Sequence, residues 1–433
     1  MNTFDFRGMK RRPSKWNVVS FWMMAAYIFF LYTSNEFLLP ARIHSLAMWA
    51  FIGCVVWKVA RRADARMPMS AYTKWYLMFF LWAAVSLAWA REWSISALYQ
   101  MAVSLVLTYC FLSEVNSARR VEACARIFAI SGAIGALMLL ATGQVFNLEA
   151  RVGQTENSNA NAFSATYMAA AIFASWLAVA KKGKSRLFYL GTLAFCLLVM
   201  AMSGGRKTIL AVAGAYVFFI LFNESGRFTK NVFAILKALA ALIVLWIVVM
   251  SVPVLYDAIG YRFEALEAMF FGGGELESSV NSDNIRLRMI EIGLSGWLTS
   301  PLWGHGVDTF KYFNLERLGY FFYAHNNYVE LLYDMGIVGF ALYYAFVVKS
   351  LKKLYLGHQV NRSFKALGGG LILSLLIFDM GGISYMTYLV QFILAVAAFC
   401  AGINDEVEGG LDAPTAFPLK MGDAEPWKER RLW

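Results

Sequence analysis

Long apolar stretches separated by short polar ones repeat along most of the chain. About 20 consecutive apolar residues are enough for a helix to cross a bilayer. The stretches are rich in Ala, Leu and Met and lack the strand-like alternation of a membrane barrel, so the pattern predicts an all-α integral membrane protein. We predict twelve spans, near residues 18–38, 42–60, 74–90, 95–112, 123–142, 160–180, 186–202, 208–222, 231–252, 330–350, 365–380 and 385–403.

One polar interruption is much longer than the others, and it divides the chain. Within it, residues 257–271 have the apolar spacing of an amphipathic surface helix, residues 272–274 are a glycine connector, and a second helix is expected from Ile285 to Leu298, ended by Pro301. The predicted organisation is an N-terminus (1–16), nine spans (17–252), a large loop (253–326), three spans (327–403) and a polar tail (404–433).

The basic residues give this topology a direction. The twelve spans divide the polar segments into two sets that lie on opposite sides of the membrane. The set that includes both termini holds 29 of the 39 Lys and Arg residues, and the set that includes the large loop holds 10. Cytoplasmic loops carry the excess of Lys and Arg, so we expect both termini in the cytoplasm and the large loop outside. The net charge of +11 comes from clusters at span ends, where anionic headgroups lie, which argues against nucleic-acid binding.

Composition supports the same class. The chain has 433 residues, of which 59 % are hydrophobic, and its mean hydropathy of +0.54 is too high for a soluble protein. The predicted spans contain few ionisable side chains, and Asp379 is the main exception. Transporters place such groups at mid-membrane, so the pattern argues against a transporter.

Several arginines on the outer side are candidates for binding an anion. Arg206 and Lys207 follow the small residues Ser203–Gly205 in a tight turn, where a guanidinium can bind a phosphate through two hydrogen bonds. The alternative is an ordinary interfacial arginine that extends to the lipid headgroups. Arg286 and Arg288 lie two apart on the predicted loop helix, so only one of them can face a given site.

The choice between these two arginines is left open by the spacing. Arg286 shares its face with Ile290 and Trp297, which favours it as the functional residue. Arg151, in another short outer loop, is a further candidate for which a solvated loop charge is the simpler interpretation.

Among the four histidines, His325 is the most informative. It precedes Asn326, a good helix-capping residue, and then an apolar run, so it is expected at the outer mouth of a span. The positive end of that helix keeps an imidazole neutral and able to accept a proton, as a general base requires. His305 lies in a glycine-flanked turn, and the outer side shows no spacing of His, Cys and carboxylates typical of a metal site.

These motifs resemble those of bacterial O-antigen ligases. His325-Asn326, nine residues, then Gly336-Ile337-Val338-Gly339 is similar to the histidine signature of that family. Arg286 followed by Pro301-Leu302-Trp303-Gly304-His305-Gly306 resembles the arginine and P-L-x-G-x-G pattern of the wider ligase and polymerase superfamily, and Ser203–Arg206 resembles its S-x-x-R turn.

The resemblance implies a fold and an activity. It implies a GT-C-like glycosyltransferase of the bacterial inner membrane with its site facing the periplasm. It would transfer a glycan, with inversion and without metal or cofactor, from undecaprenyl diphosphate to a sugar hydroxyl of lipid A–core. The resemblance carries the role of base to His325 and the role of diphosphate ligand to Arg206 and Arg286. Arg288, Arg151, Asn326, His305 and Lys207 are further candidates for substrate binding.

Two alternatives stay open from the sequence. An O-antigen polymerase shares the superfamily and would lengthen the lipid-linked glycan itself. A transporter of lipid-linked glycans would use the same donor without catalysis. The expected partners are therefore a lipid-linked glycan, an acceptor glycolipid and membrane lipids, and not nucleic acid.

Overall fold

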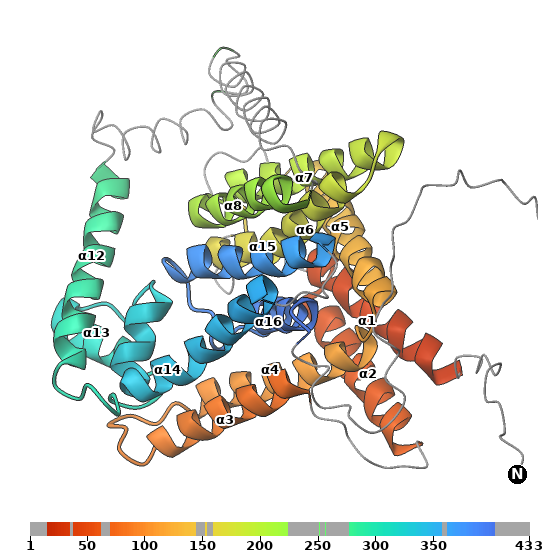
Figure 1. Cartoon of the computed structure of the whole chain (residues 1–433). Coiled ribbons are helices and arrows are strands. Elements are labelled where there is room, and N and C mark those ends of the chain that lie inside the picture. The colour runs from red at the N-terminus through yellow and green to blue at the C-terminus, as the bar shows by residue number, and fades with distance from the viewer. Residues whose placement is uncertain are drawn as a thin grey trace, which may run out of the picture.

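The structure is a computed structural model that describes residues 15–34, 38–61, 70–143, 152–153, 159–223, 251, 256, 277–356 and 362–402. Over these residues the regular structure is helical, apart from a single bridge between Ser34 and Leu39 (Figure 1). The predicted all-α class is confirmed. The predicted span 231–252, the surface helix 257–271, the glycine connector and the terminal tails lie outside the described residues.

The helices follow the apolar runs of the sequence. Their bounds are α1 (Lys15–Thr33), α2 (Ala41–Ala60), α3 (Ala71–Ser86), α4 (Ile95–Glu114), α5 (Ala118–Ala141), α6 (Ala160–Ala180), α7 (Gly183–Met202), α8 (Arg206–Asn223), α12 (Glu277–Trp297), α13 (Phe310–Leu318), α14 (Asn327–Leu356), α15 (Arg362–Asp379) and α16 (Tyr388–Cys400). Eleven of the twelve predicted spans coincide with one of these helices. Among the described residues, six helices are long and apolar enough to cross a bilayer, namely α2, α4, α5, α6, α7 and α14. The chain is therefore a multi-pass membrane protein, and the count of twelve spans stays a prediction.

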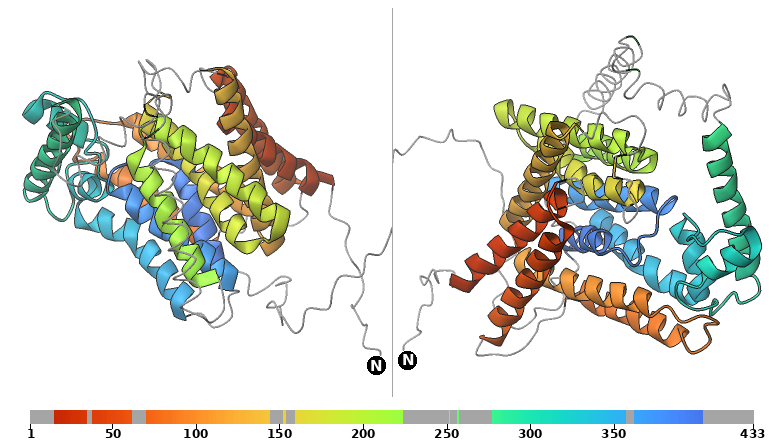
Figure 2. Two further views of the ribbon diagram at one scale, coloured as in Figure 1. Left: turned by 90° about the horizontal axis from the view of Figure 1, so that it is seen from above. Right: turned by 180° about the vertical axis from the view of Figure 1, so that it is seen from behind.

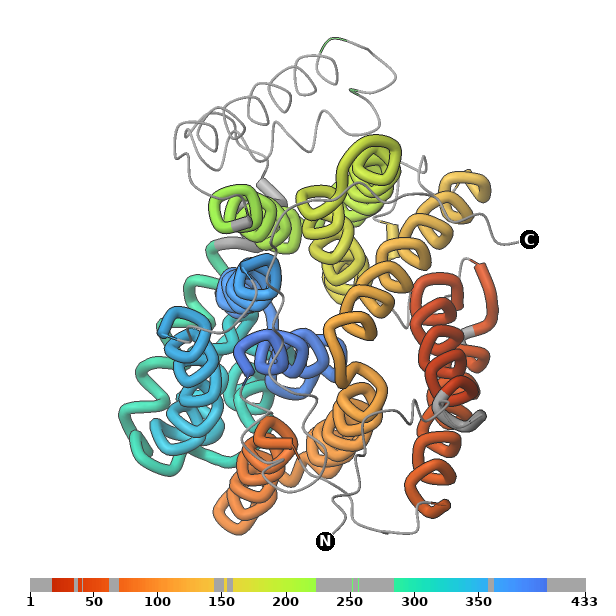
Figure 3. The backbone as a smooth tube through the Cα atoms, turned by 45° about the vertical axis from the view of Figure 1, so that its right-hand side comes forward, coloured from red at the N-terminus to blue at the C-terminus, as the bar shows by residue number. Residues whose placement is uncertain are grey.

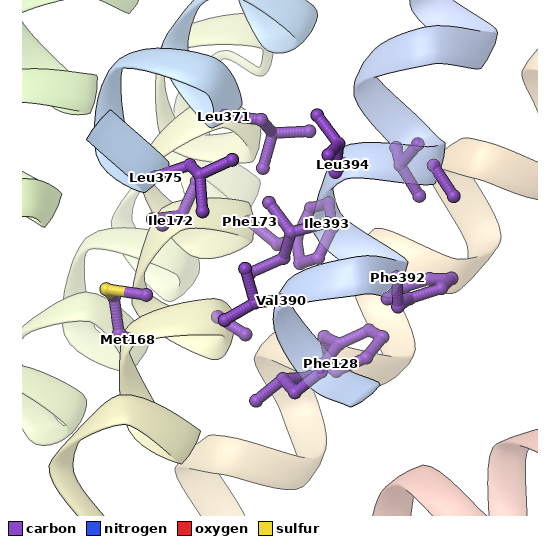
Figure 4. Close-up of a cluster of buried hydrophobic side chains, with 14 of the residues drawn as sticks. Phe128, Met168, Ile172, Phe173, Leu371, Leu375, Val390, Phe392, Ile393 and Leu394 are labelled. Atoms are coloured by element: carbon purple, nitrogen blue, oxygen red, sulfur yellow. The ribbon is translucent and has the colours of Figure 1, made fainter. Parts of the chain in front are cut away.

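The main apolar core extends through the helix bundle, and Figure 4 shows the part of it where α5, α6, α15 and α16 meet. The rings of Phe128, on α5, and Phe392, on α16, stack with their centroids 5.3 Å apart. Nearby, α8 runs along α15, and a Cβ at Gly370 would lie 2.2 Å from the Phe219 ring. Small residues allow such close helix packing where lipid replaces water and burial of apolar surface drives association only weakly. Figures 2 and 3 show α15 and α16 inside the bundle.

Contacts join segments that the charge pattern assigns to the same side of the membrane. On the predicted cytoplasmic side, Lys181 Nζ lies 2.5 Å from Glu122 Oε1. On the predicted outer side, the end of α3 and the loop that follows it meet α13 and the turn before it. Arg91 pairs with Glu316 at 2.7 Å, and the Val307 N–H donates to Ser86 Oγ at 3.0 Å. The assignment of these sides to cytoplasm and periplasm stays a prediction.

The end of the large loop forms a helical cap beside the first turns of α14 (Figures 1 and 2). The helix predicted from Ile285 to Leu298 is present as α12, which begins earlier, at Glu277. Helix α13 was not predicted, because its nine residues are too few to show a clear helical period. It forms where the buried Asp334 carboxylate accepts the N–H groups of Asp308, Thr309 and Phe310 at 2.9–3.1 Å. A side chain from α14 thus caps the first turn of another helix.

Helix α14 is interrupted at Gly336, whose φ of 63° and ψ of −172° are not helical. In a regular helix the N–H groups of residues 337 and 338 would bond the carbonyls of 333 and 334. Here the turn 301–306 supplies the hydrogen-bond partners for the free carbonyls before Gly336 and for the free N–H groups after it. The bonds are His305 N to Tyr333 O at 2.9 Å, Gly306 N to Asp334 O at 2.7 Å, Ile337 N to Pro301 O at 2.9 Å and Val338 N to Leu302 O at 3.3 Å.

Contrary to the prediction from the sequence, Asp379 is not the main ionisable exception in the spans, because other ionisable side chains are buried there too. Glu330 and Asp334 are also fully buried in α14, and Lys58 on α2 pairs with Glu114 on α4 inside the bundle. The reason is that each has protein partners. Glu330 and Asp334 accept backbone N–H groups of the outer loop, and Glu114 also accepts the hydroxyl of Ser20 at 2.7 Å. Buried charge is tolerated when it is hydrogen-bonded.

Candidate active site

His325 stands in a constrained backbone position just before α14. Its φ of 53° lies in the left-handed region, which non-glycine residues rarely adopt. Asn326 Oδ1 accepts the N–H groups of Tyr328 and Val329 at 3.0 and 3.1 Å, so the predicted helix cap is confirmed. On the other side of His325, the Ala324 N–H donates to Glu330 Oε2 at 2.5 Å. The residue is thus held from both flanks, and strain of this kind is concentrated at functional sites.

The His325 ring is kept neutral. It packs against the Tyr323 ring with the centroids 4.2 Å apart. Burial, and after it the positive charges of Arg286 and Lys207, together lower the pKa of His325 from 6.5 to about 4. This direction agrees with the predicted neutral imidazole, and burial and the two cations act in the same sense as the positive end of α14.

Arg286 and Arg288 differ in their surroundings on α12. Arg286 is half-buried, whereas Arg288 is exposed. Arg286 also lowers the pKa of Tyr323, against a larger raising effect of burial. Its charge therefore acts on both members of the His325–Tyr323 pair, which favours Arg286 over Arg288 as the residue that faces the site.

The turn before α8 presents Arg206 and Lys207 at the first positions of that helix. Gly204 has a φ of 71°, and a Cβ at Gly205 would lie 1.8 Å from Ser164 Oγ, so only small residues let this turn sit against α6. Lys207 Nζ donates to the Gly381 carbonyl at 3.1 Å. Two cations at the positive end of a helix repel the helix dipole, so the arrangement favours binding of an anion there.

The other predicted binding residues lie in different settings. His305 lies in the turn that fills the gap in α14. Its ring stacks on Tyr333, and its Nε2 lies 3.0 Å from the Gly296 carbonyl oxygen. Asn326 uses its side chain as the cap of α14. Arg151 lies outside the described residues. The roles proposed for these three residues in substrate binding stay predictions.

Three residues of this region were missed by the sequence interpretation. Tyr323 packs on the His325 ring, Glu330 holds the backbone beside it, and Asp334 organises α13. The available signal was the pair of acids at positions 330 and 334 in an otherwise apolar span, since carboxylates in such a segment require a specific partner.

Comparison with known proteins agrees with the motifs. Residues 191–344 match the family model described as "O-Antigen ligase". This stretch runs from α7 to the middle of α14 and contains Arg206, Arg286 and His325, and it supports the expected superfamily. No curated protein is significantly similar to the chain.

Proposed function

Because residues 191–344 match the O-antigen ligase family, we propose that this chain is a glycosyltransferase that moves a glycan from undecaprenyl diphosphate to a sugar hydroxyl of lipid A–core. The observation that carries the proposal is electrostatic. Arg286 on α12 and Lys207 on α8 both act on the neutral His325 ring, although these residues lie far apart in the sequence.

The cations are the proposed diphosphate site. Arg206, Lys207 and Arg286 would hold the two phosphates at the outer membrane interface, with the polyprenyl tail among the spans. Arginine cannot deprotonate, and its planar fork suits a phosphate. The same groups would stabilise the charge that collects on the leaving diphosphate, so the reaction needs no metal.

His325 is the proposed general base. The neutral imidazole takes the proton from the acceptor hydroxyl as that oxygen attacks the anomeric carbon of the donor sugar. The new C–O glycosidic bond forms while the bond from the anomeric carbon to the phosphate oxygen breaks, and undecaprenyl diphosphate leaves with the electron pair. Attack from the face opposite the leaving group inverts the anomeric centre.

The topology that fits this chemistry is the predicted one. The protein would lie in the bacterial inner membrane with twelve spans in a GT-C-like arrangement, both termini in the cytoplasm and the site open to the periplasm. Buried acids in spans are typical of transporters. Here Glu330 and Asp334 accept backbone N–H groups of the large loop, which gives them a structural role and weakens the transporter alternative.

Reconstituted transfer tests the proposal. Purified protein in proteoliposomes is expected to join lipid-linked glycan to lipid A–core in the presence of a chelator. Arg286→Gln is expected to raise KM for the donor and lower kcat, by a combined factor of about 10²–10³, as loss of one charged transition-state contact does. Arg288→Gln on the same helix serves as the comparison, and a smaller effect is expected.

Different outcomes separate the alternatives. A protein that lengthens the diphosphate-linked glycan with no lipid A–core present is a polymerase. One that moves the donor across the bilayer without forming a glycosidic bond is a transporter. An equal loss in both arginine variants would contradict the assignment of Arg286.

The pH dependence follows from the environment of His325. The pKa of about 4 belongs to the protein without substrate, so the acid limb of kcat/KM is expected near pH 4 rather than 6.5. Activity falls as pH falls through this value, because protonation removes the base. Bound diphosphate would offset the charges of Arg286 and Lys207 and raise the pKa, so the limb of kcat should lie at higher pH.

Initial rates from about pH 3 to 9 measure the acid limbs of kcat/KM and of kcat. Arg286→Gln should move the limb of kcat/KM upward, because it removes a cation that disfavours imidazolium. If the acid limbs of kcat/KM and kcat both lay near pH 6.5 and did not move in Arg286→Gln, His325 would not be the group that titrates.

A further inference from the structure

A cavity of about 230 Å³ lies beside the His325–Tyr323 pair. Its walls come from four places in the chain: the first turns of α4, the start of α13, the aromatic run that leads to His325, and the segment between α15 and α16. The lining residues are Ser96, Ala97, Gln100, Asp308, Lys311, Phe321, Phe322, Tyr323, Ile383 and Met386. None of the cations that act on His325 is among them.

The charge of this cavity differs from that of the diphosphate site. Its lining contains one carboxylate, that of Asp308, and one ammonium, that of Lys311. Their Oδ2 and Nζ atoms lie 2.5 Å apart, so the two charges offset each other. A phosphate would find no net positive charge here, whereas a neutral polar ligand could use the remaining donors and acceptors.

The remaining walls combine aromatic faces with fixed polar groups. Phe321 and Phe322 are 50 % and 54 % exposed. The Asp308 N–H donates to Asp334 Oδ2 at 2.9 Å, and its carboxylate accepts the hydroxyl of Ser94. A pyranose has apolar C–H faces and a rim of hydroxyl groups that both donate and accept. Aromatic walls with a few preorganised polar groups are complementary to such a molecule.

The position of the cavity connects it with the base. Tyr323 lines the cavity, and its ring packs against the His325 ring at an interplanar angle of 47°. We propose that this cavity binds the acceptor sugar, an uncharged pyranose of the lipid A–core glycan, and presents its hydroxyl to His325. The proposal rests on the proposed function. The donor sugar is a less suitable occupant, because it is attached to the diphosphate and must lie beside the cationic groups.

Two variants of lining residues that do not touch His325 test this assignment. Phe322→Ala and Gln100→Ala are each expected to raise KM for lipid A–core about tenfold, the effect of losing one good contact. KM for the lipid-linked donor and kcat at saturating acceptor should stay within about twofold. Tyr320→Ala is the matched control, since Tyr320 is 40 % exposed two residues before Phe322 and does not line the cavity.

Binding of the soluble core oligosaccharide, measured by titration calorimetry on the full-length protein, separates this proposal from the proposed function. Binding by the wild type that is lost in Phe322→Ala supports the cavity even if no transfer is detected, in which case the transferase proposal alone fails. A rise in donor KM instead of acceptor KM, an equal effect of Tyr320→Ala, or binding that is unchanged in Phe322→Ala would overturn the assignment.

Discussion

Replacing His325 with alanine is expected to lower kcat for glycan transfer by about 10²–10⁴-fold, the range that a positioned general base contributes. KM for the donor should change little, because the proposed diphosphate ligands Arg206, Lys207 and Arg286 are all retained. The measurement is steady-state transfer by purified variants in proteoliposomes, with the melting temperature of each variant recorded in parallel.

A second substitution separates loss of the base from loss of local structure. His325 has a positive φ, which alanine adopts less easily than asparagine does. His325→Asn therefore keeps the backbone conformation and the polarity while removing the basic nitrogen. Both variants should be equally inactive, and added imidazole should restore part of the rate in His325→Ala. Activity within tenfold of wild type in His325→Asn would eliminate this residue as the base.

Binding of the proposed donor would prepare His325 for its proposed role as the base. A ring with a pKa of about 4 is neutral at physiological pH, but such a low pKa makes it a weak proton acceptor. Burial contributes most of the lowering, and Arg286 and Lys207 add to it. A bound diphosphate brings negative charge to the same cations, so it would raise the pKa of His325 toward the working pH. The base would thus become stronger when the donor is in place.

The sequence predicted the parts of this protein that depend on local patterns. Apolar runs located the helices because a membrane span must be both apolar and long. The Asn326 cap could be predicted because capping involves neighbouring residues only. Arg206 was selected because it follows a turn of small residues, and His325 because it precedes the Asn326 cap and an apolar run.

The features that were missed depend on contacts between distant segments. Helix α13 has little apolar periodicity, and it begins where the Asp334 carboxylate accepts N–H groups from residues 24–26 positions earlier in the chain. The cavity joins residue 96 to residue 386, a separation that no local pattern can reveal. The low pKa of His325 likewise depends on burial and on charges from the distant helices α8 and α12.

The glycines at positions 304 and 336 are required where the turn 301–306 packs into the gap in α14. Gly336 belongs to the histidine signature, and Gly304 belongs to the turn thirty residues earlier. A Cβ on Gly336 would lie 2.3 Å from the Leu302 carbonyl oxygen, and a Cβ on Gly304 would lie 2.5 Å from the Asp334 carbonyl. The two motifs therefore form a single unit in which one backbone fills a gap in the other. This unit joins the loop that carries Arg286 to the helix that follows His325.

Substitution of Gly336 is accordingly expected to be among the most destabilising changes in the chain. Gly336→Ala must abandon a backbone conformation that is almost restricted to glycine, and its Cβ displaces the inserted turn. The combined cost is on the order of 3–5 kcal/mol, from backbone strain and from the loss of hydrogen bonds across the gap. Gly319→Ala is the matched control, because Gly319 also has a positive φ, of 77°, but has no atom within 4 Å of the added Cβ. It should cost only about 1–2 kcal/mol.

Thermal unfolding in detergent, followed by tryptophan fluorescence, measures both variants. The ring centroids of Trp303, in the inserted turn, and Trp82 lie 5.6 Å apart. Displacement of the turn should therefore change the fluorescence emission of the folded protein in Gly336→Ala but not in Gly319→Ala. Because α14 begins directly after His325, the same variant should lose transfer activity at temperatures where it is still folded. If Gly336→Ala were no less stable than Gly319→Ala and kept its emission spectrum, the inserted turn would not be what holds α12 and α14 together. The loss of activity in that variant would then need another cause.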